Sequence, residues 1–140
     1  MIYRSPKATV GAVVYNPVAG NISILLTKRN IEPFKGFWCL PGGHVEIFEN
    51  INDAVIREVK EETNLSFTPS FFTWSEEIFK EMDLHYVALF FYGPGNGKIV
   101  IDEVEVAEIG WFDVNEALKL NLAFRHNEVL LVYKNSLTNL

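Results

Sequence analysis

The pattern of apolar and polar positions predicts that the chain begins with a β-hairpin. Residues 8–16 (ATVGAVVYN) and 22–29 (ISILLTKR) are rich in β-branched and other apolar residues, and the turn-forming segment PVAGN separates them. Residues 30–46 are aromatic and turn-rich, which indicates a loop that leads into a short strand. Residues 49–63 contain no Gly or Pro and predict a helix.

The second half of the chain predicts more strands and two helices. Strands are expected at residues 65–74, 84–93 and 108–114, with a tight turn at 94–98. Asp113 and Glu116 have the spacing of a capping box for a short helix, and residues 125–135 form an amphipathic closing helix. Because helices and strands are interspersed, the expected fold class is α/β or α+β, built as one domain over residues 1–140 around a mixed sheet.

Composition narrows the kinds of protein that fit. The 140 residues are 49% apolar and 21% charged, as in ordinary globular proteins. A net charge of −6 argues against nonspecific binding to nucleic acid or to an anionic membrane. The single cysteine, Cys39, excludes an intrachain disulfide and a cysteine-cluster metal site. No segment reaches the roughly 20 apolar residues of a membrane span, so a cytoplasmic protein is expected.

The helix expected at 49–63 carries acidic residues where the protein body should lie. At about 100° per residue, its apolar stripe consists of Ile51, Ala54, Val55 and Val59. Glu58 and Glu62 fall inside this stripe and Glu61 lies at its margin, whereas a solvated acidic face would lie opposite. Arg57 is expected to point away from Glu58 and Glu62.

This placement needs a compensating charge. Carboxylates about 5 Å apart repel by roughly 3 kcal/mol per pair at an effective dielectric near 20, and the last turn of a helix disfavours anions. Magnesium prefers oxygen ligands and is often shared with substrate phosphates. The preceding residues 41–43 (PGG) are interpreted as a tight turn whose backbone can approach a ligand closely.

These residues resemble the signature of the Nudix hydrolases. The matching positions are Gly43, Glu49 and residues 57–65 (REVKEETNL), and residues 36–46 and 108–118 resemble the family's flanking segments. The family usually has Gly at the position of Asn64, and Asn also tolerates the left-handed conformation of a helix C-terminus. The resemblance implies a mixed sheet sandwiched between helices. It also implies hydrolysis of a nucleoside diphosphate linked to another group, with Mg²⁺ or Mn²⁺ as cofactor.

The resemblance also assigns roles to residues. The metal ligands would be Glu58, Glu61, Glu62 and a backbone carbonyl of Gly42 or Gly43. Glu58 would also be a candidate base for the attacking water, and Glu49 would pair with Arg57 to brace the loop against the helix. An alternative base from a later loop is Glu105, ahead of Glu103 and Glu108.

Substrate contacts are expected from the second strand and the loop after it. Arg29 would reach the substrate phosphates, and Phe34 and Trp38 are candidates to stack on a base, although at least two of the aromatics Phe34, Phe37, Trp38 and Trp74 are expected in the core. The three histidines, His44, His85 and His126, have no mutual ligand spacing and are interpreted as structural or peripheral.

Two segments, 32–46 and 122–133, resemble the branch of the family that hydrolyses ADP-ribose. That branch often has a proline about fifteen residues after the signature, which is absent here. The expected substrate is ADP-ribose or a related nucleoside diphosphate sugar. The alternatives are pyrophosphohydrolysis of a nucleoside triphosphate, including damaged nucleotides, and a nucleotide sensor without catalysis. Many relatives are dimers, so a homodimer is an open expectation.

Overall fold

The computed structural model describes residues 4–138 of the chain. Its strands are β1 (Lys7–Asn16), β2 (Gly20–Arg29), β3 (Trp38–Cys39), β4 (Gly42–His44), β5 (Ser66–Phe67), β6 (Ser70–Phe79), β7 (Leu84–Asn96) and β8 (Val106–Asp113). Its α-helices are α1 (Ile51–Thr63), α2 (Val114–Ala117) and α3 (His126–Thr138), and a short 3-10 helix covers Lys80–Met82. Among the described residues, no helix is long and apolar enough to cross a bilayer.

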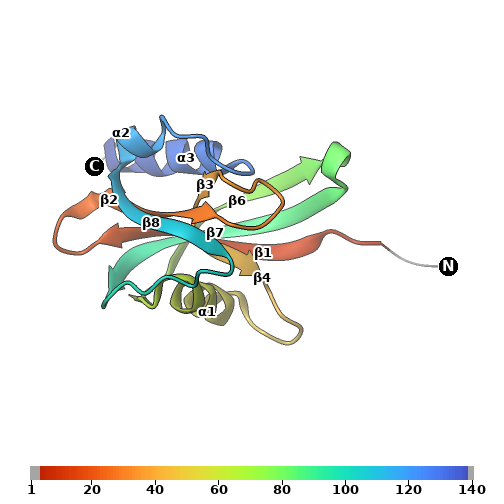
Figure 1. Cartoon of the computed structure of the whole chain (residues 1–140), viewed down its shortest axis with the longest axis horizontal. Helices are drawn as coiled ribbons and strands as arrows, with labels where there is room; N and C mark the ends of the chain where they lie inside the picture. The colour runs from red at the N-terminus through yellow and green to blue at the C-terminus, as the bar shows by residue number, and fades with distance from the viewer. Residues whose placement is uncertain (1–3, 139–140) are drawn as a thin grey trace.

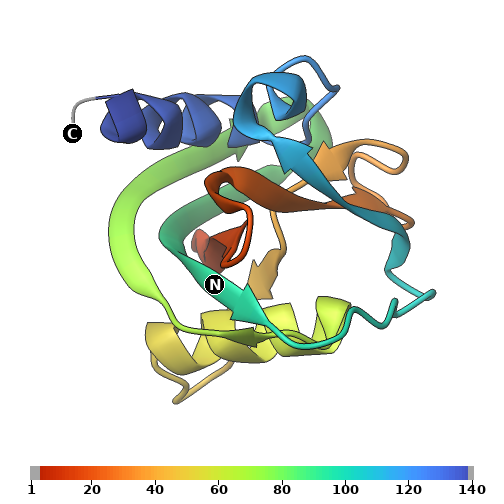
Figure 2. The ribbon, with the colours of Figure 1, turned by 90° about the vertical axis from the view of Figure 1, so that its left-hand side faces the viewer.

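The strands form one mixed sheet. Its main order is β3-β2-β1-β7-β5, with β4 paired to β1, β6 to β7 and β8 to β2. The β1–β7 pair is parallel, whereas the other pairs are antiparallel. Helix α1 covers one side of the strands, and α2 and α3 lie on the other side (Figures 1 and 2). The predicted mixed sheet between helices is therefore confirmed.

Two apolar clusters hold these layers together, and β1 contributes to both. Val10, Ala12 and Val14 point toward α1, while Val13 points toward α3, because successive side chains of a strand face opposite sides. The α1 cluster includes Val55 of the helix, which is fully buried. Burial on both faces explains why residues 8–16 are nearly continuously apolar.

The edge of β1 is shared between two neighbouring strands, and this division opens a cavity. Strand β2 pairs with β1 only near Tyr15 and Asn16. Toward its beginning, β1 pairs instead with β4, from Thr9 opposite His44 to Gly11 opposite Gly42. Strand β2 diverges from β1 and pairs with β8 along most of its length. Residues of β1, β2 and β4 line this cavity together with Glu58 and Glu62 of α1.

Several boundaries differ from the sequence prediction. Helix α1 begins at Ile51, two residues later than expected, because the side chain of Asn50 accepts the Asp53 N–H at 2.8 Å and caps the helix. Strand β7 continues through Asn96, so the tight turn predicted at 94–98 is wrong. Strand β6 extends to Phe79, five residues beyond its predicted end.

The short helix α2 forms where it was predicted, with a different cap. Asp113 accepts the Asn115 N–H at 2.8 Å, while Glu116 pairs with Lys119 at 3.1 Å instead of folding back on the cap residue. The predicted helix is confirmed, and its reciprocal capping box is not formed.

Candidate active site

Helix α1 presents two carboxylates to the protein interior. Glu58 and Glu62 are 9% and 7% exposed, on the same face as the fully buried Val55 and Val59. Their predicted inward orientation is confirmed. Glu61 is different, since its side chain is 56% exposed.

The end of α1 adopts the predicted conformation. Asn64 has φ 68°, in the left-handed region, and its N–H donates to the Lys60 carbonyl at 2.9 Å. Asn64 thus takes the left-handed conformation that glycine most often adopts at the end of a helix.

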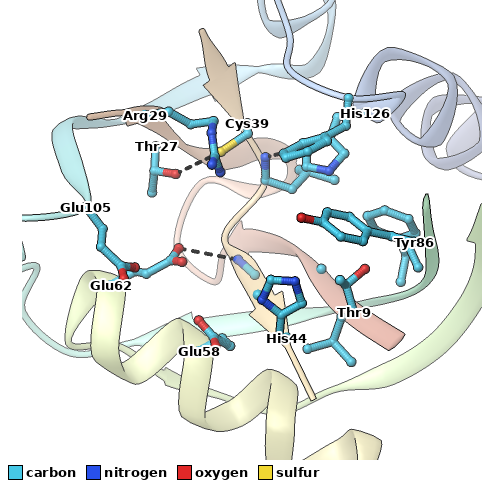
Figure 3. Close-up of a pocket in the computed structure, with 18 of the residues that line it drawn as sticks. Thr9, Thr27, Arg29, Cys39, His44, Glu58, Glu62, Tyr86, Glu105 and His126 are labelled. Atoms are coloured by element: carbon cyan, nitrogen blue, oxygen red, sulfur yellow. Dashed lines mark hydrogen bonds between the residues drawn. The ribbon is translucent and has the colours of Figure 1, made fainter. Parts of the chain in front are cut away.

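The inward carboxylates line a cavity of about 280 Å³. Figure 3 shows Glu58, Glu62 and Glu105 on one side of it and Tyr86 and His126 on the other. The volume lies near the lower end of ordinary ligand pockets, about 300–1,000 Å³. A cavity of this size can enclose part of a dinucleotide-sized molecule.

Burial and mutual repulsion perturb both carboxylates. Burial, and next the neighbouring Glu58 carboxylate, raise the pKa of Glu62 well above its ordinary value, although Gly42 N–H donates to its Oε2 at 3.3 Å. Burial also raises the pKa of Glu58, an effect that Arg57 opposes. Glu105 adds to the repulsion on both groups. The α1 end of the cavity therefore disfavours the charged forms of its carboxyl groups in the absence of a further cation.

Glycines allow β4 to pass close to α1. The segment interpreted as a tight turn is instead the strand β4, because Gly42 and Gly43 pair with β1. A Cβ atom on Gly43 would lie 2.5 Å from the Glu58 carboxyl group, and one on Gly42 would lie 2.1 Å from the Val10 carbonyl oxygen. The prediction of a turn is wrong, while the close backbone approach does occur.

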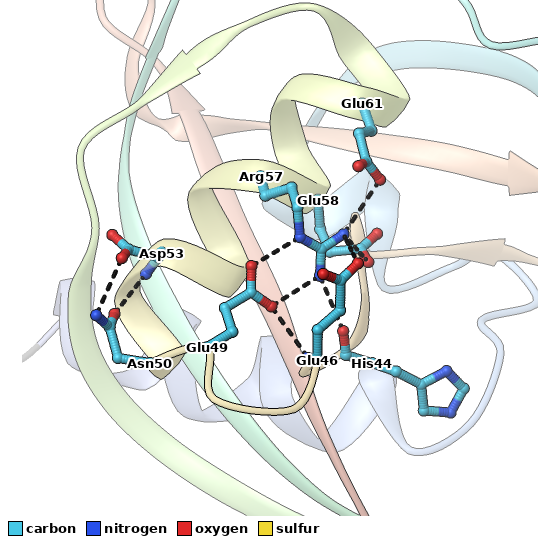
Figure 4. Close-up of polar contacts among 8 residues, drawn as sticks. All are labelled: His44, Glu46, Glu49, Asn50, Asp53, Arg57, Glu58 and Glu61. Atoms are coloured by element: carbon cyan, nitrogen blue, oxygen red, sulfur yellow. Dashed lines mark hydrogen bonds and ion pairs between the residues drawn. The ribbon is translucent and has the colours of Figure 1, made fainter.

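Arg57 joins the loop before α1 to the acidic helix face (Figure 4). Its Nε and Nη2 donate to the two carboxylate oxygens of Glu49 at 2.8 and 3.0 Å. Its Nη1 contacts Glu58 Oε1 at 3.0 Å and Glu61 Oε2 at 3.2 Å. The prediction that Arg57 points away from Glu58 is therefore wrong, because its guanidinium lies across the helix edge. Hydrogen bonds from Arg57 lower the pKa of Glu49 to about 2.

Two further residues predicted for the site line the cavity. Arg29, at the end of β2, donates from Nε to the Pro33 carbonyl at 2.7 Å and lies 5.0 Å from the centroid of the Phe124 ring. Glu105 lies just before β8 and faces the acidic end. By contrast, Glu108 lies outside the cavity lining and is 3.8 Å from Lys28.

The aromatic residues expected to contact substrate lie elsewhere. Phe34 packs against Phe124 with ring centroids 4.9 Å apart, and Trp38 packs edge-on against Phe112 at 5.0 Å. Neither Phe34 nor Trp38 is among the described residues that line the cavity. Tyr86 and Phe124 provide aromatic surface there instead.

Several lining residues were not singled out from the sequence. Glu77 and His126 are buried in the cavity wall, and His44 also lines it. Of the two readings of the histidines, a peripheral place does not hold for His126, whereas a structural one fits its contact with the Leu40 N–H at 3.0 Å. Cys39 lines the cavity too, but burial raises its thiol pKa to about 11, which makes it a poor nucleophile. Glu77 could have been found by extending β6 across the pair Glu76–Glu77, since one of two consecutive strand residues must face inward.

The carboxylates are not assembled as a complete metal site. Across residues 4–138, no three acidic, histidine or cysteine side chains converge at metal-ligand spacing. Glu61 does not line the cavity and contacts Arg57. Glu58, Glu62 and Glu105 nevertheless offer a group of carboxylate oxygens on one side of the cavity, and such oxygens are the ligands that suit a hard divalent cation.

Comparison with known proteins agrees with the fold and the signature. The NUDIX domain family matches residues 5–133. The chain is 32% identical over 133 residues to an ADP-ribose pyrophosphatase of Methanocaldococcus jannaschii, covering 94% of this chain and 75% of that protein. It is 29% identical over 137 residues to the ADPR responsive transcriptional repressor NtrR of Acinetobacter baylyi, covering 91% of this chain and 53% of the repressor.

Among solved structures, the NUDIX domain of Shewanella oneidensis NrtR, complexed with ADP ribose, superposes with a TM-score of 0.83 at 21% identity. The match covers 96% of this chain and 90% of that one, and it supports the fold. The chain belongs to the NUDIX domain family. The family assignment and the pyrophosphohydrolase class predicted from the sequence are both confirmed.

Proposed function

We propose that this protein hydrolyses the diphosphate bond of ADP-ribose or a related nucleoside diphosphate sugar, with the help of a divalent cation. The observation that carries the proposal is the pair of buried carboxylates, Glu58 and Glu62, facing a cavity that Arg29 also lines. The resemblance to an ADP-ribose pyrophosphatase over 94% of the chain supports the substrate class.

The carboxylates would hold the cation. Glu58 and Glu62 are the main ligands, with Glu61 or Glu105 and a carbonyl of Gly42 or Gly43 completing the set. Glu61 must leave its contact with Arg57 if it is to join them. A bound Mg²⁺ or Mn²⁺ would neutralise phosphate oxygens and lower the pKa of an attacking water. The raised pKa values of Glu58 and Glu62 support this assignment, because a cation would offset the burial and the carboxylate repulsion that raise them.

The remaining side chains position the reaction. Arg29 binds the diphosphate, held in place by the Pro33 carbonyl and the Phe124 ring. The Glu49–Arg57 pair keeps Glu58 in place against β4. Glu58 or Glu105 accepts the proton of the water as its oxygen bonds to phosphorus and the bridging P–O bond breaks. The products of ADP-ribose hydrolysis are AMP and ribose 5-phosphate.

Turnover with a panel of nucleotides in Mg²⁺ tests the proposal. ADP-ribose should be cleaved to AMP and ribose 5-phosphate at a higher kcat/KM than nucleoside triphosphates. Preferred cleavage of triphosphates to monophosphate and pyrophosphate would favour the alternative substrate class.

A sensor without catalysis is the second candidate, and one observation favours it. A transcriptional repressor matches 91% of this chain, which spans about half of the repressor's length (53%). Measuring both the binding and the turnover of ADP-ribose distinguishes the two functions. A sensor binds ADP-ribose tightly without turnover, whereas the proposed enzyme releases both products.

The remaining expectations concern partners and location. The proposal takes a small nucleotide as the ligand, with neither nucleic acid nor membrane as a partner. A homodimer and a cytoplasmic location stay predictions.

A further inference from the structure

Two buried polar groups at the aromatic side of the cavity have a free hydrogen-bonding position each. Glu77 is 2% exposed and His126 is 7% exposed, and both line the cavity. They come from different elements, β6 and the first turn of α3. Glu77 Oε1 lies 3.9 Å from His126 Nε2, which is beyond hydrogen-bond distance.

One polar atom of each side chain already has a partner, and this identifies the atom that is left to bind a ligand. Glu77 Oε2 accepts the Arg125 N–H at 2.9 Å. His126 Nδ1 accepts the Leu40 N–H at 3.0 Å, so the neutral ring carries its hydrogen on Nε2. Burial lowers the pKa of His126 to about 3, which keeps the ring neutral. The cavity wall thus offers an acceptor, Glu77 Oε1, beside a donor, His126 Nε2–H.

We propose that Glu77 and His126 read the edge of an adenine base that carries the N6 amino group and N7. This assignment rests on the proposed function, because it places the base of the nucleoside diphosphate at the aromatic side while the diphosphate lies toward Glu58 and Glu62. The N6 amino group donates to Glu77 Oε1, and N7 accepts from His126 Nε2–H. Adenine presents this donor–acceptor pattern, whereas guanine and hypoxanthine present two acceptors, O6 and N7.

The surroundings suit a flat base. The rings of Tyr86 and Phe124 line the cavity with centroids 6.1 Å apart and planes tilted by 47°. A base can therefore stack on one ring and contact the edge of the other. Arg29 influences the ionisation of both Glu62 and His126, which places its charge between the two ends of the cavity (Figure 3).

A purely structural role for Glu77 explains less of this arrangement. Holding the Arg125 N–H requires one oxygen, and a neutral glutamine would serve equally well. The carboxylate lines the cavity, and burial raises its pKa to about 7 because the charged form is disfavoured there. An N–H donor from a ligand would favour the charged form by bonding to Glu77 Oε1.

The wild-type protein alone permits the first test. Affinities of AMP, IMP, purine-riboside monophosphate and 7-deaza-AMP are measured by calorimetry at pH 8. AMP should bind at least about tenfold more tightly than each analogue, because each analogue loses one of the two hydrogen bonds. Affinities that agree within about twofold would overturn the assignment.

Variants provide the second test. In Glu77→Gln, the Arg125 N–H retains the amide oxygen, so the NH₂ group faces the cavity beside His126 Nε2–H. The ratio of AMP to IMP affinity should fall to one or below, since two donors suit O6 and N7. Glu76→Gln changes an exposed neighbour on the same strand and should leave the ratio unchanged. An unchanged ratio in folded Glu77→Gln would refute the proposal.

Binding of the monophosphates does not require hydrolysis, so the two proposals can fail separately. Adenine preference without turnover of ADP-ribose would support the base site and contradict the enzyme. Turnover of ADP-ribose without adenine preference would support the enzyme and overturn the base site.

Discussion

Replacing Glu62 with glutamine removes a buried charge while preserving the shape of the side chain. The amide oxygen can still accept the Gly42 N–H that Glu62 Oε2 accepts now at 3.3 Å. Glu58 lies one turn earlier on the same buried face, and residues so spaced on a helix are about 5–6 Å apart. Two charges at this distance repel by about 3 kcal/mol at an effective dielectric near 20.

Partial protonation already relieves some of that repulsion, as the raised pKa of Glu62 indicates. We therefore expect Glu62→Gln to stabilise the metal-free protein by about 1–3 kcal/mol at pH 8, which raises Tm by about 3–10 °C for a chain of this size. The same variant should lose most of the Tm increase that Mg²⁺ gives the wild type. Turnover should fall by roughly 100-fold or more, because a metal ligand is missing.

Thermal melting with and without Mg²⁺, together with turnover, measures these effects. Glu81→Gln, which removes an exposed charge, is the control for the change in net charge and should melt within about 1 °C of the wild type. The reasoning is refuted if metal-free Glu62→Gln is less stable than the wild type, or if it responds to Mg²⁺ and turns over substrate as the wild type does.

Four further variants test other parts of the site. Arg29→Ala should lower kcat/KM by about one to two orders of magnitude, since a charge-assisted contact is worth roughly 1.5–3 kcal/mol. An unchanged kcat/KM in steady-state kinetics would show that Arg29 does not contact the substrate. Arg57→Lys cannot reproduce the two-pronged contact with Glu49, so turnover should fall about 10- to 100-fold, and wild-type rates would contradict the bracing role. If Glu105 is the base, Glu105→Gln should remove the low-pH limb of the pH–rate profile, where a catalytic base becomes protonated, and if Glu58 is the base that limb should remain. The pKa of Glu77 rises from 4.5 to about 7 on folding, so ionisation of this group destabilises the folded wild type as pH rises through that window. In denaturant titrations, the free energy of unfolding of Glu77→Gln relative to wild type should therefore increase by up to about 3 kcal/mol between pH 4.5 and 7. A stability difference that does not change with pH would contradict this.

Local rules predicted the acidic helix well. The 3.6-residue period placed Glu58 and Glu62 on the buried face, and both are buried. The tolerance of asparagine for the left-handed conformation predicted the end of α1 at Asn64, which has φ 68°. Both predictions depend only on residues that are neighbours along the helix.

Long-range pairing defeated other predictions. Gly42 and Gly43 have the composition of a turn, yet they form a strand because β2 diverges from β1 and leaves its edge to β4. Arg57 contacts Glu58 because its guanidinium also bonds to Glu49 and lies across the edge of the helix. The angular position of a residue on a helix does not specify the direction of so long a side chain. Glu77 was missed because two consecutive glutamates, Glu76 and Glu77, do not have the apolar composition of a strand, although β6 continues through them.

Aromatic composition was the least informative signal. Phe34 and Trp38 belong to the loop and strand expected to contact substrate, but both pack against other rings. Tyr86 and Phe124, which line the cavity, are distant in sequence from that loop. Which aromatic side chains face a cavity depends on the packing of several elements, and the sequence of one segment does not determine it.

The most direct test of the proposed function is the separation of products after incubation of the purified protein with ADP-ribose, in Mg²⁺ and in excess chelator. The expected result is equimolar AMP and ribose 5-phosphate in Mg²⁺ and no products in chelator. Equal product formation in chelator would contradict the role of the divalent cation, and intact ADP-ribose in both would contradict the enzymatic function.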